Sequence, residues 1–96
     1  MQKQRVIYEV VPPNERRTSN IMSLYEYTEV VSVRASHLNE DPSTPVFTDT
    51  KGCYDVISIA KKEIAERRCP FIIQRKVSET KVEHWAVNEM ELPELD

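Results

Sequence analysis

The strongest constraint on the fold lies between Cys53 and Trp85, where a helical pattern runs into Pro70 and then changes to strand-forming residues. Before the proline, apolar and charged residues recur at helical spacing, with Val56, Ile57, Ala60 and Ile64 on one side and Lys61, Lys62, Glu66 and Arg67 on the other. Proline cannot continue a helix, and the side chains at 71–73 favour strands. The segment therefore predicts an amphipathic helix followed directly by a strand.

An earlier helix is predicted from Ser23 to about Asn39. Ser23 and Glu26 fit an S-x-x-E capping box, in which both side chains bind backbone N–H groups at the start of a helix. Pro42 and Pro45 mark its end. We expect its apolar stripe to consist of Leu24, Tyr27, Val31, Ala35 and Leu38.

The elements around the second helix complete an α+β pattern. Residues 40–52 contain two prolines and the single glycine of the chain, which predicts a loop, and Asp55 is the expected N-cap of the second helix. After Pro70, two strands are expected near 71–77 and 81–87, joined by the short link 78–80 into an antiparallel hairpin. The predicted fold is a small α+β domain of two main helices and this hairpin, with an extended N-terminal arm.

The two ends of the chain differ from its middle. Residues 1–20 combine a short apolar run with Pro12 and Pro13, which predicts one short strand followed by an extended arm, and the whole segment is positively charged. The last eight residues are negatively charged, which argues against a general polyanion binder. We therefore expect an arm at 1–20, a domain at 21–92 and an acidic tail at 93–96.

Size and composition limit the possible classes of function. With 96 residues, 40% of them hydrophobic, the chain predicts one small core without a large buried active site. A partner surface could supply part of the stability of so small a domain. Cys53 and Cys69 form no CxxC pair, and no secretory or membrane-spanning segment is visible, so we expect an intracellular, reduced protein without membrane contact.

Short motifs follow one another between Arg17 and Met90. They are Thr18, Met22, Ser23, Tyr25 and Glu26; Arg34 and Ala35; Pro45, Val46 and Phe47; Asp49, Gly52 and Asp55; Ile59, Ala60, Lys62 and Glu63; and Pro70, Ile73, Arg75, Glu83, Trp85, Val87 and Glu89. Their order resembles the omega-like small subunit of multisubunit DNA-directed RNA polymerases, a family that includes bacterial omega, archaeal subunit K and the eukaryotic common subunit six. Every one of these motifs is structural, and none is a reaction site.

The sequence also departs from the family it resembles. The family's hairpin usually carries Pro-Asp-Gly where this chain has Ser78, Glu79 and Thr80, and the loop before Pro45 is longer. The long acidic N-terminal tail of the eukaryotic subunit has no counterpart. These departures imply a divergent member, either of archaeal type or encoded by a large DNA virus, and the divergence leans towards the virus.

The resemblance implies a noncatalytic subunit without cofactor or metal. Such a subunit packs on the largest polymerase subunit, promotes assembly within a hetero-oligomer, and makes no specific DNA contact. Its compartment would be the nucleus, or the host cytoplasm and virion for a viral member. The expected partner-binding residues are Met22, Tyr25, Glu26, Tyr27, Arg34, Arg75 and Trp85, because aromatic and arginine side chains dominate interface energetics. For Tyr27 and Trp85, simple packing in the small core is the alternative.

Other functions are less well supported by the sequence. A zinc site made from His37, Cys53, Cys69 and His84 lacks paired ligand spacing, and a cysteine–histidine nucleophile lacks any accompanying substrate-positioning motif. One glycine allows no P-loop. Two alternatives stay open. One is a protein adaptor that uses the arm, and the other is a nucleic-acid module whose phosphate contacts would be Arg16, Arg17, Lys61, Lys62, Arg67, Arg68, Arg75 and Lys76.

Overall fold

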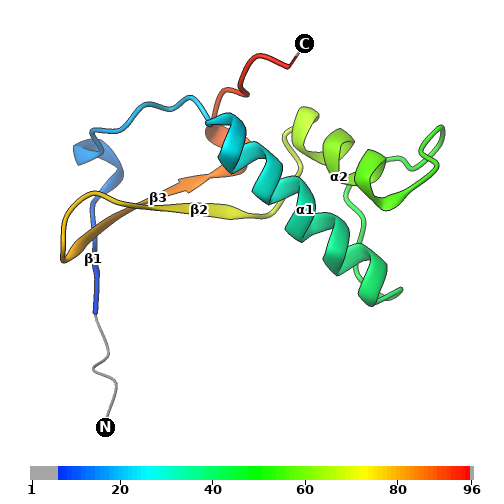
Figure 1. Cartoon of the computed structure of the whole chain (residues 1–96), viewed down its shortest axis with the longest axis horizontal. Helices are drawn as coiled ribbons and strands as arrows, with labels where there is room; N and C mark the ends of the chain where they lie inside the picture. The colour runs from blue at the N-terminus through cyan, green and yellow to red at the C-terminus, as the bar shows by residue number, and fades with distance from the viewer. Residues whose placement is uncertain (1–6, 96) are drawn as a thin grey trace, which may run out of the picture.

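The structure is a computed structural model that describes residues 7–95, and it has an α+β architecture (Figure 1). The first six residues of the expected arm and the last residue of the expected tail lie outside the described residues. Within the described range, the elements are β1 (Glu9–Val10), a 3-10 turn η1 (Pro13–Glu15), α1 (Leu24–Glu40), α2 (Val56–Ala65), β2 (Ile72–Lys76), β3 (Lys81–Ala86) and a second 3-10 turn η2 (Val87–Glu89).

Helix α1 begins at the predicted capping box. The Ser23 hydroxyl accepts a hydrogen bond from the Glu26 N–H at 3.0 Å, and the Glu26 carboxylate accepts one from the Ser23 N–H at 2.9 Å. The buried side chains of the helix are Tyr27, Val30, Val31, Arg34 and Ala35. Leu24 is 59% exposed, so its predicted place in the apolar stripe is wrong, and the stripe begins one turn later.

Helix α2 begins at Asp55, whose carboxylate accepts a 2.7 Å hydrogen bond from the Ser58 N–H, as predicted. Ala60 and Ile64 are buried, whereas Ile57 is half-exposed. Glu63 is also buried, although a carboxylate within an apolar face is not expected from the helical pattern. The two helices pack against each other, and the loop 41–55 connects them.

The sheet has three strands in the order β1-β3-β2, because the short strand expected in the N-terminal segment joins the predicted hairpin. β2 and β3 pair antiparallel, with Ile73 opposite Trp85 and Arg75 opposite Glu83, and β1 pairs parallel with β3. The third strand forms because Glu9 donates to the Thr80 carbonyl at 2.7 Å and the Val11 N–H donates to the Val82 carbonyl at 2.9 Å. Residues 7–20 therefore begin with an edge strand of the sheet, in the segment where one short strand is expected before the arm (Figure 1).

The core lies between the helices and one face of the sheet. Its buried members are Met22, Tyr27, Val30, Val31, Ala35, Ala60, Ile64, Cys69, Trp85, Val87 and Met90. Phe71 and Ile73 of the sheet side pack against this cluster and are half-buried. The core therefore unites α1, α2 and the inner face of the β2–β3 pair.

No helix in the described part of the chain is both long enough and apolar enough to cross a membrane.

Candidate functional site

A buried ion pair joins the two helices. Arg34 of α1 donates from Nε to Glu63 Oε1 at 2.7 Å and from Nη2 to Oε2 at 2.9 Å, and the two residues are 3% and 0% exposed. Burial opposes ionisation of Glu63, but the hydrogen bonds from Arg34 and from the Phe47 N–H lower the pKa of its carboxyl nevertheless. The hydrogen bonds that Arg34 donates to Glu63 raise the pKa of Arg34 as well. Both groups are therefore charged inside the protein.

This ion pair also fixes the loop between the helices. Arg34 Nη2 donates to the Pro45 carbonyl at 2.7 Å, and Glu63 Oε2 accepts from the Phe47 N–H at 2.9 Å. The Arg34 guanidinium lies 5.5 Å from the centroid of the Phe47 ring. The Arg-Ala and Pro-Val-Phe motifs that carry the family resemblance thus meet each other across the fold.

A second buried carboxylate, Glu83 on β3, holds the N-terminal segment against the sheet. It accepts hydrogen bonds from the Arg17 N–H at 2.8 Å, from the backbone and side chain of Thr18, and from Trp85 Nε1 at 3.1 Å. Burial alone would raise the pKa of Glu83, but these donors lower it to about 2. A charged, fully hydrogen-bonded Glu83 therefore anchors residues 17 and 18.

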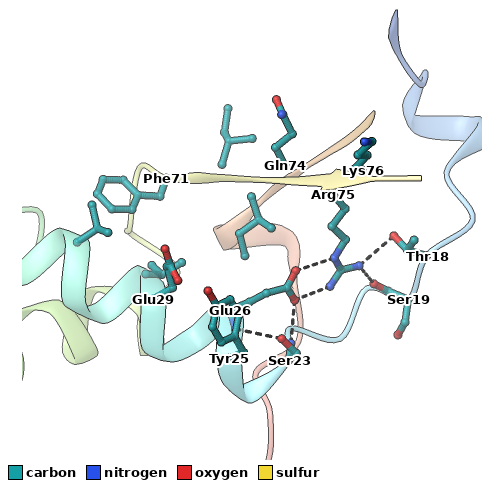
Figure 2. Close-up of a pocket in the computed structure, with 14 residues that line it drawn as sticks. Thr18, Ser19, Ser23, Tyr25, Glu26, Glu29, Phe71, Gln74, Arg75 and Lys76 are labelled. Atoms are coloured by element: carbon teal, nitrogen blue, oxygen red, sulfur yellow. Dashed lines mark hydrogen bonds and ion pairs between the residues drawn. The ribbon is translucent and has the colours of Figure 1, made fainter. Parts of the chain in front are cut away.

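Arg75 on β2 forms the third polar contact between distant segments. Its guanidinium pairs with the Glu26 carboxylate through two 2.9 Å hydrogen bonds, and it also donates to Thr18 Oγ1 and to the Ser19 and Ile21 carbonyls. Figure 2 shows this side chain reaching from β2 to the start of α1 and to the N-terminal segment. The Arg75 hydrogen bonds are the main reason that the pKa of Glu26 falls to about 2.

Trp85 lies inside this network. Its ring is 8% exposed, and the Arg16 guanidinium carbon lies 3.7 Å from the ring centroid. Its Nε1 donates to Thr18 Oγ1 at 3.1 Å, and Arg16 in turn forms an ion pair with Glu89. The alternative of a core role is therefore confirmed for Trp85, and also for Tyr27, which is buried in α1.

The seven expected partner-binding residues fall into three groups. Met22, Tyr27, Arg34 and Trp85 are buried by this chain's own packing. Glu26 and Arg75 are half-buried and pair with each other, whereas the Tyr25 side chain is 76% exposed. Partner contact stays a prediction for all seven, and Tyr25 is the residue that could make it without any rearrangement of the core.

An open groove lies between α1 and β2, and sequence patterns alone did not indicate it. Its volume is about 900 Å³, and its lining includes Tyr25, Glu29 and Val33 from the helix and Ile72 and Lys76 from the strand. Ile72 is 64% exposed. Strand alternation does place Ile72 and Ile73 on opposite faces, which is the one signal in the sequence for an apolar side chain outside the core.

The alternative metal and nucleophile sites have no support in the structure. Over residues 7–95, no group of three or more His, Cys, Asp or Glu side chains could hold a metal ion. Cys69 is fully buried, and burial raises the pKa of its thiol, whereas a reactive cysteine needs a lowered pKa. His84 lies on the exposed side of β3, where its ring is 3.0 Å from Gln74 Oε1.

Comparison with known proteins identifies the family, although no family model matches the sequence. The chain is 34% identical over 80 residues to subunit RPABC2 of DNA-directed RNA polymerases I, II and III from Saccharomyces cerevisiae, which covers 83% of the chain. It is 38% identical over 92 residues, 91% of the chain, to the DNA-directed RNA polymerase subunit 6 homolog of African swine fever virus. It is 33% identical over 75 residues, 78% of the chain, to subunit 6B of RNA polymerases II and V from Arabidopsis thaliana.

The matches cover most of this chain but only part of each relative. The chain spans 50%, 60% and 51% of the length of the yeast, viral and plant proteins, respectively. The resemblance inferred from the motifs between Arg17 and Met90 is confirmed by relatives from both eukaryotes and a large DNA virus. The chain therefore belongs to the omega-like family of RNA polymerase small subunits that includes the eukaryotic common subunit six and its viral homologues.

Proposed function

We propose that this chain is a noncatalytic subunit of a DNA-directed RNA polymerase that binds the largest subunit and promotes assembly and stability of the transcribing complex. The observation that carries the proposal is its similarity, over 83% and 91% of its length, to two proteins named as RNA polymerase subunits. Its compartment would then be that of its polymerase, which is the nucleus, or the host cytoplasm and virion for a viral member. The proposal needs no cofactor or metal.

The exposed apolar side chains of the chain are consistent with binding to a partner protein. Several large apolar side chains at the start of α1 and beside the groove are more than half exposed, namely Ile21, Leu24, Tyr25 and Ile72. Burying apolar surface on a partner contributes roughly 25 cal/mol per Å² before the costs of association. A partner that binds only the folded chain would also stabilise it by mass action.

The nucleic-acid alternative is weakened by the contacts of the basic residues. Arg16, Arg67 and Arg75 pair with carboxylates. Lys62 and Arg68 donate to the Asp49 and Phe47 carbonyls, respectively. A phosphate-binding surface needs several basic side chains that no carboxylate neutralises, and its affinity for nucleic acid falls steeply with salt. These pairings therefore favour the protein-binding function over phosphate contact.

The proposal is tested by affinity purification of the tagged chain from its native cell or infected host at moderately high salt. We expect the two largest polymerase subunits to be recovered in near-stoichiometric amounts. Recovery of the folded chain alone would contradict the proposal and favour an adaptor for some other protein. Nucleic acid that is recovered at low salt and lost at high salt would favour the phosphate-binding alternative.

A further inference from the structure

The sheet has two edges, and they differ in length and regularity. The β1 edge is two residues long, and Pro12 and Pro13 follow it closely. The β2 edge is a regular five-residue strand, and no strand of the described chain pairs with its outer side. A regular free edge presents a row of backbone groups that a further strand can bind. β2 is therefore the edge at which an additional strand can bind.

The backbone groups that face outward from β2 follow from its pairing with β3. The Val87 N–H donates to the Phe71 carbonyl and the Val77 N–H to the Lys81 carbonyl, both at 3.0 Å. In an antiparallel pair, hydrogen-bonded and non-bonded positions alternate. The N–H and C=O groups of residues 72, 74 and 76 therefore point away from β3. We call these three residues the edge site.

The edge site faces the groove between α1 and β2. Figure 2 shows β2 almost edge-on, with β3 behind it and α1 along its lower side. The groove is lined by Ile72, Val33 and Tyr25, which are 64%, 39% and 76% exposed. An extended chain bound here would gain backbone hydrogen bonds from the strand and apolar contacts from the helix, which is how peptides bind by adding a strand to a sheet.

The groove has a negative charge at one end and a positive charge at the other. Four charged residues line the groove, and two of them, Glu26 and Arg75, neutralise each other as an ion pair. The other two are Glu29 and Lys76. Glu29 lies towards the Phe71 end of β2 and Lys76 marks the other end (Figure 2). Lys76 Nζ is 3.7 Å from Glu79, but both side chains are exposed, so this pair is weak and Lys76 is available to a partner.

We propose that an extended segment of the largest polymerase subunit binds the edge site as a fourth strand. The segment carries apolar side chains at alternate positions, a basic side chain near Glu29 and an acidic one near Lys76. A second copy of this chain fits less well, because β2 has the sequence IIQRK and offers no carboxylate to Lys76. The inference rests on the proposed function, since it specifies where the largest subunit is bound.

The test uses Gln74, the central residue of the edge site. Gln74→Pro removes one outward N–H and places the proline ring where the partner strand would approach, without removing a bond to β3. Gln74→Ala is the matched control, because it keeps the N–H and loses the side chain and its contact with His84. Binding of each variant of the 96-residue chain to the purified largest subunit of the cognate polymerase is measured, together with its melting temperature.

We expect Gln74→Pro to bind at least about ten-fold more weakly than Gln74→Ala, because only the alanine variant keeps the outward N–H. Equal binding of the proline variant and the wild type would overturn the edge site and leave the proposed function intact. Failure of the wild type itself to bind would contradict the proposed function instead. A concentration-dependent dimer of the wild type that Gln74→Pro abolishes would overturn the inference in favour of a second copy.

Hydrogen exchange supplies a second measurement if the proline variant does not fold. In the wild-type complex, the amides of Ile72, Gln74 and Lys76 should exchange at least ten-fold more slowly than in the free chain, because each would then donate to the partner strand. Unchanged exchange at all three positions in a complex that does form would overturn the proposal.

Discussion

At the scale of single residues, the structure depends on two buried carboxylates that join segments far apart in the sequence. Glu63 connects α2 to Arg34 of α1 and to the loop at Phe47. Glu83 connects β3 to residues 17 and 18. A buried carboxylate is tolerated only when donors surround it, so each of the two fixes the position of several donors at once.

Arg34→Met should strongly destabilise the chain, because it leaves the Glu63 charge buried without its cation. Breaking a buried pair in this way costs about 3–5 kcal/mol, which a small domain can hardly withstand. The double variant Arg34→Met with Glu63→Leu should be more stable than the single variant, since no unpaired charge remains. Urea unfolding of the three proteins measures the difference. A double variant less stable than Arg34→Met would contradict this account.

Stability should fall in acid through the carboxyls of Glu26 and Glu83. Folding lowers the pKa of each from 4.5 to about 2. The folded state therefore binds protons at these carboxyls less readily than the unfolded state. The stability that the ionised carboxylates contribute is fully present above about pH 4.5 and is lost as the pH falls towards 2. We expect Glu83→Gln to be less stable than the wild type at neutral pH and to lose less stability on acidification. Urea midpoints across this range measure both, and parallel pH profiles would contradict the assignment.

At the scale of elements, the end of α2 shows how a local backbone cost is offset by side-chain contacts. Arg67 has φ of 58°, in the left-handed region, and follows the helix where glycine is usual. The Arg67 N–H donates to the Ile64 carbonyl and the Arg68 N–H to the Glu63 carbonyl, which is the Schellman arrangement. The Arg67 side chain donates to the Asn88 and Met90 carbonyls and so links the helix end to the segment after β3.

Arg67→Ala should destabilise the chain more than Arg67→Gly. Both variants lose the bonds to the Asn88 and Met90 carbonyls, but only alanine keeps a side chain in the left-handed conformation, which costs about 1 kcal/mol. Thermal and urea unfolding of the two variants isolate this backbone cost, because their lost contacts are the same. Equal stability of the two would mean that residue 67 changes its backbone conformation when the arginine is removed.

The sequence predicts those elements whose signals are local. The capping box at Ser23 and the N-cap at Asp55 act within one helical turn, so both appear where expected. The local apolar run before Pro12 also predicts the short strand β1, but no local pattern reveals its parallel pairing with β3 through hydrogen bonds to residues 80 and 82. Burial of Glu63 likewise depends on Arg34, which lies in the other helix. The groove escaped prediction for the same reason, since it requires the relative placement of α1 and β2.

At the scale of the whole molecule, the chain is extended for its size. Its radius of gyration is 15.5 Å, compared with roughly 12–13 Å for a compact domain of this length, and it measures 45 × 36 × 22 Å. An extended shape exposes more surface for a given mass, which leaves a large area for the partner contact proposed above. The exposed apolar side chains lie in more than one region, and the proposed partner would cover either the groove or the α2 side.

Two exposed tyrosines distinguish these regions. Tyr25 lines the groove at the start of α1, whereas Tyr54 precedes α2 and is 97% exposed. If the groove face binds the largest subunit, Tyr25→Ala should weaken binding roughly ten-fold, about 1.4 kcal/mol, because exposed aromatic residues dominate interface energetics. Tyr54→Ala should bind like the wild type, and neither variant should lower the melting temperature appreciably, since neither ring belongs to the core. Titration calorimetry with the purified largest subunit measures both affinities. The opposite result, a loss of binding in Tyr54→Ala alone, would place the interface on the α2 side and remove the groove from consideration.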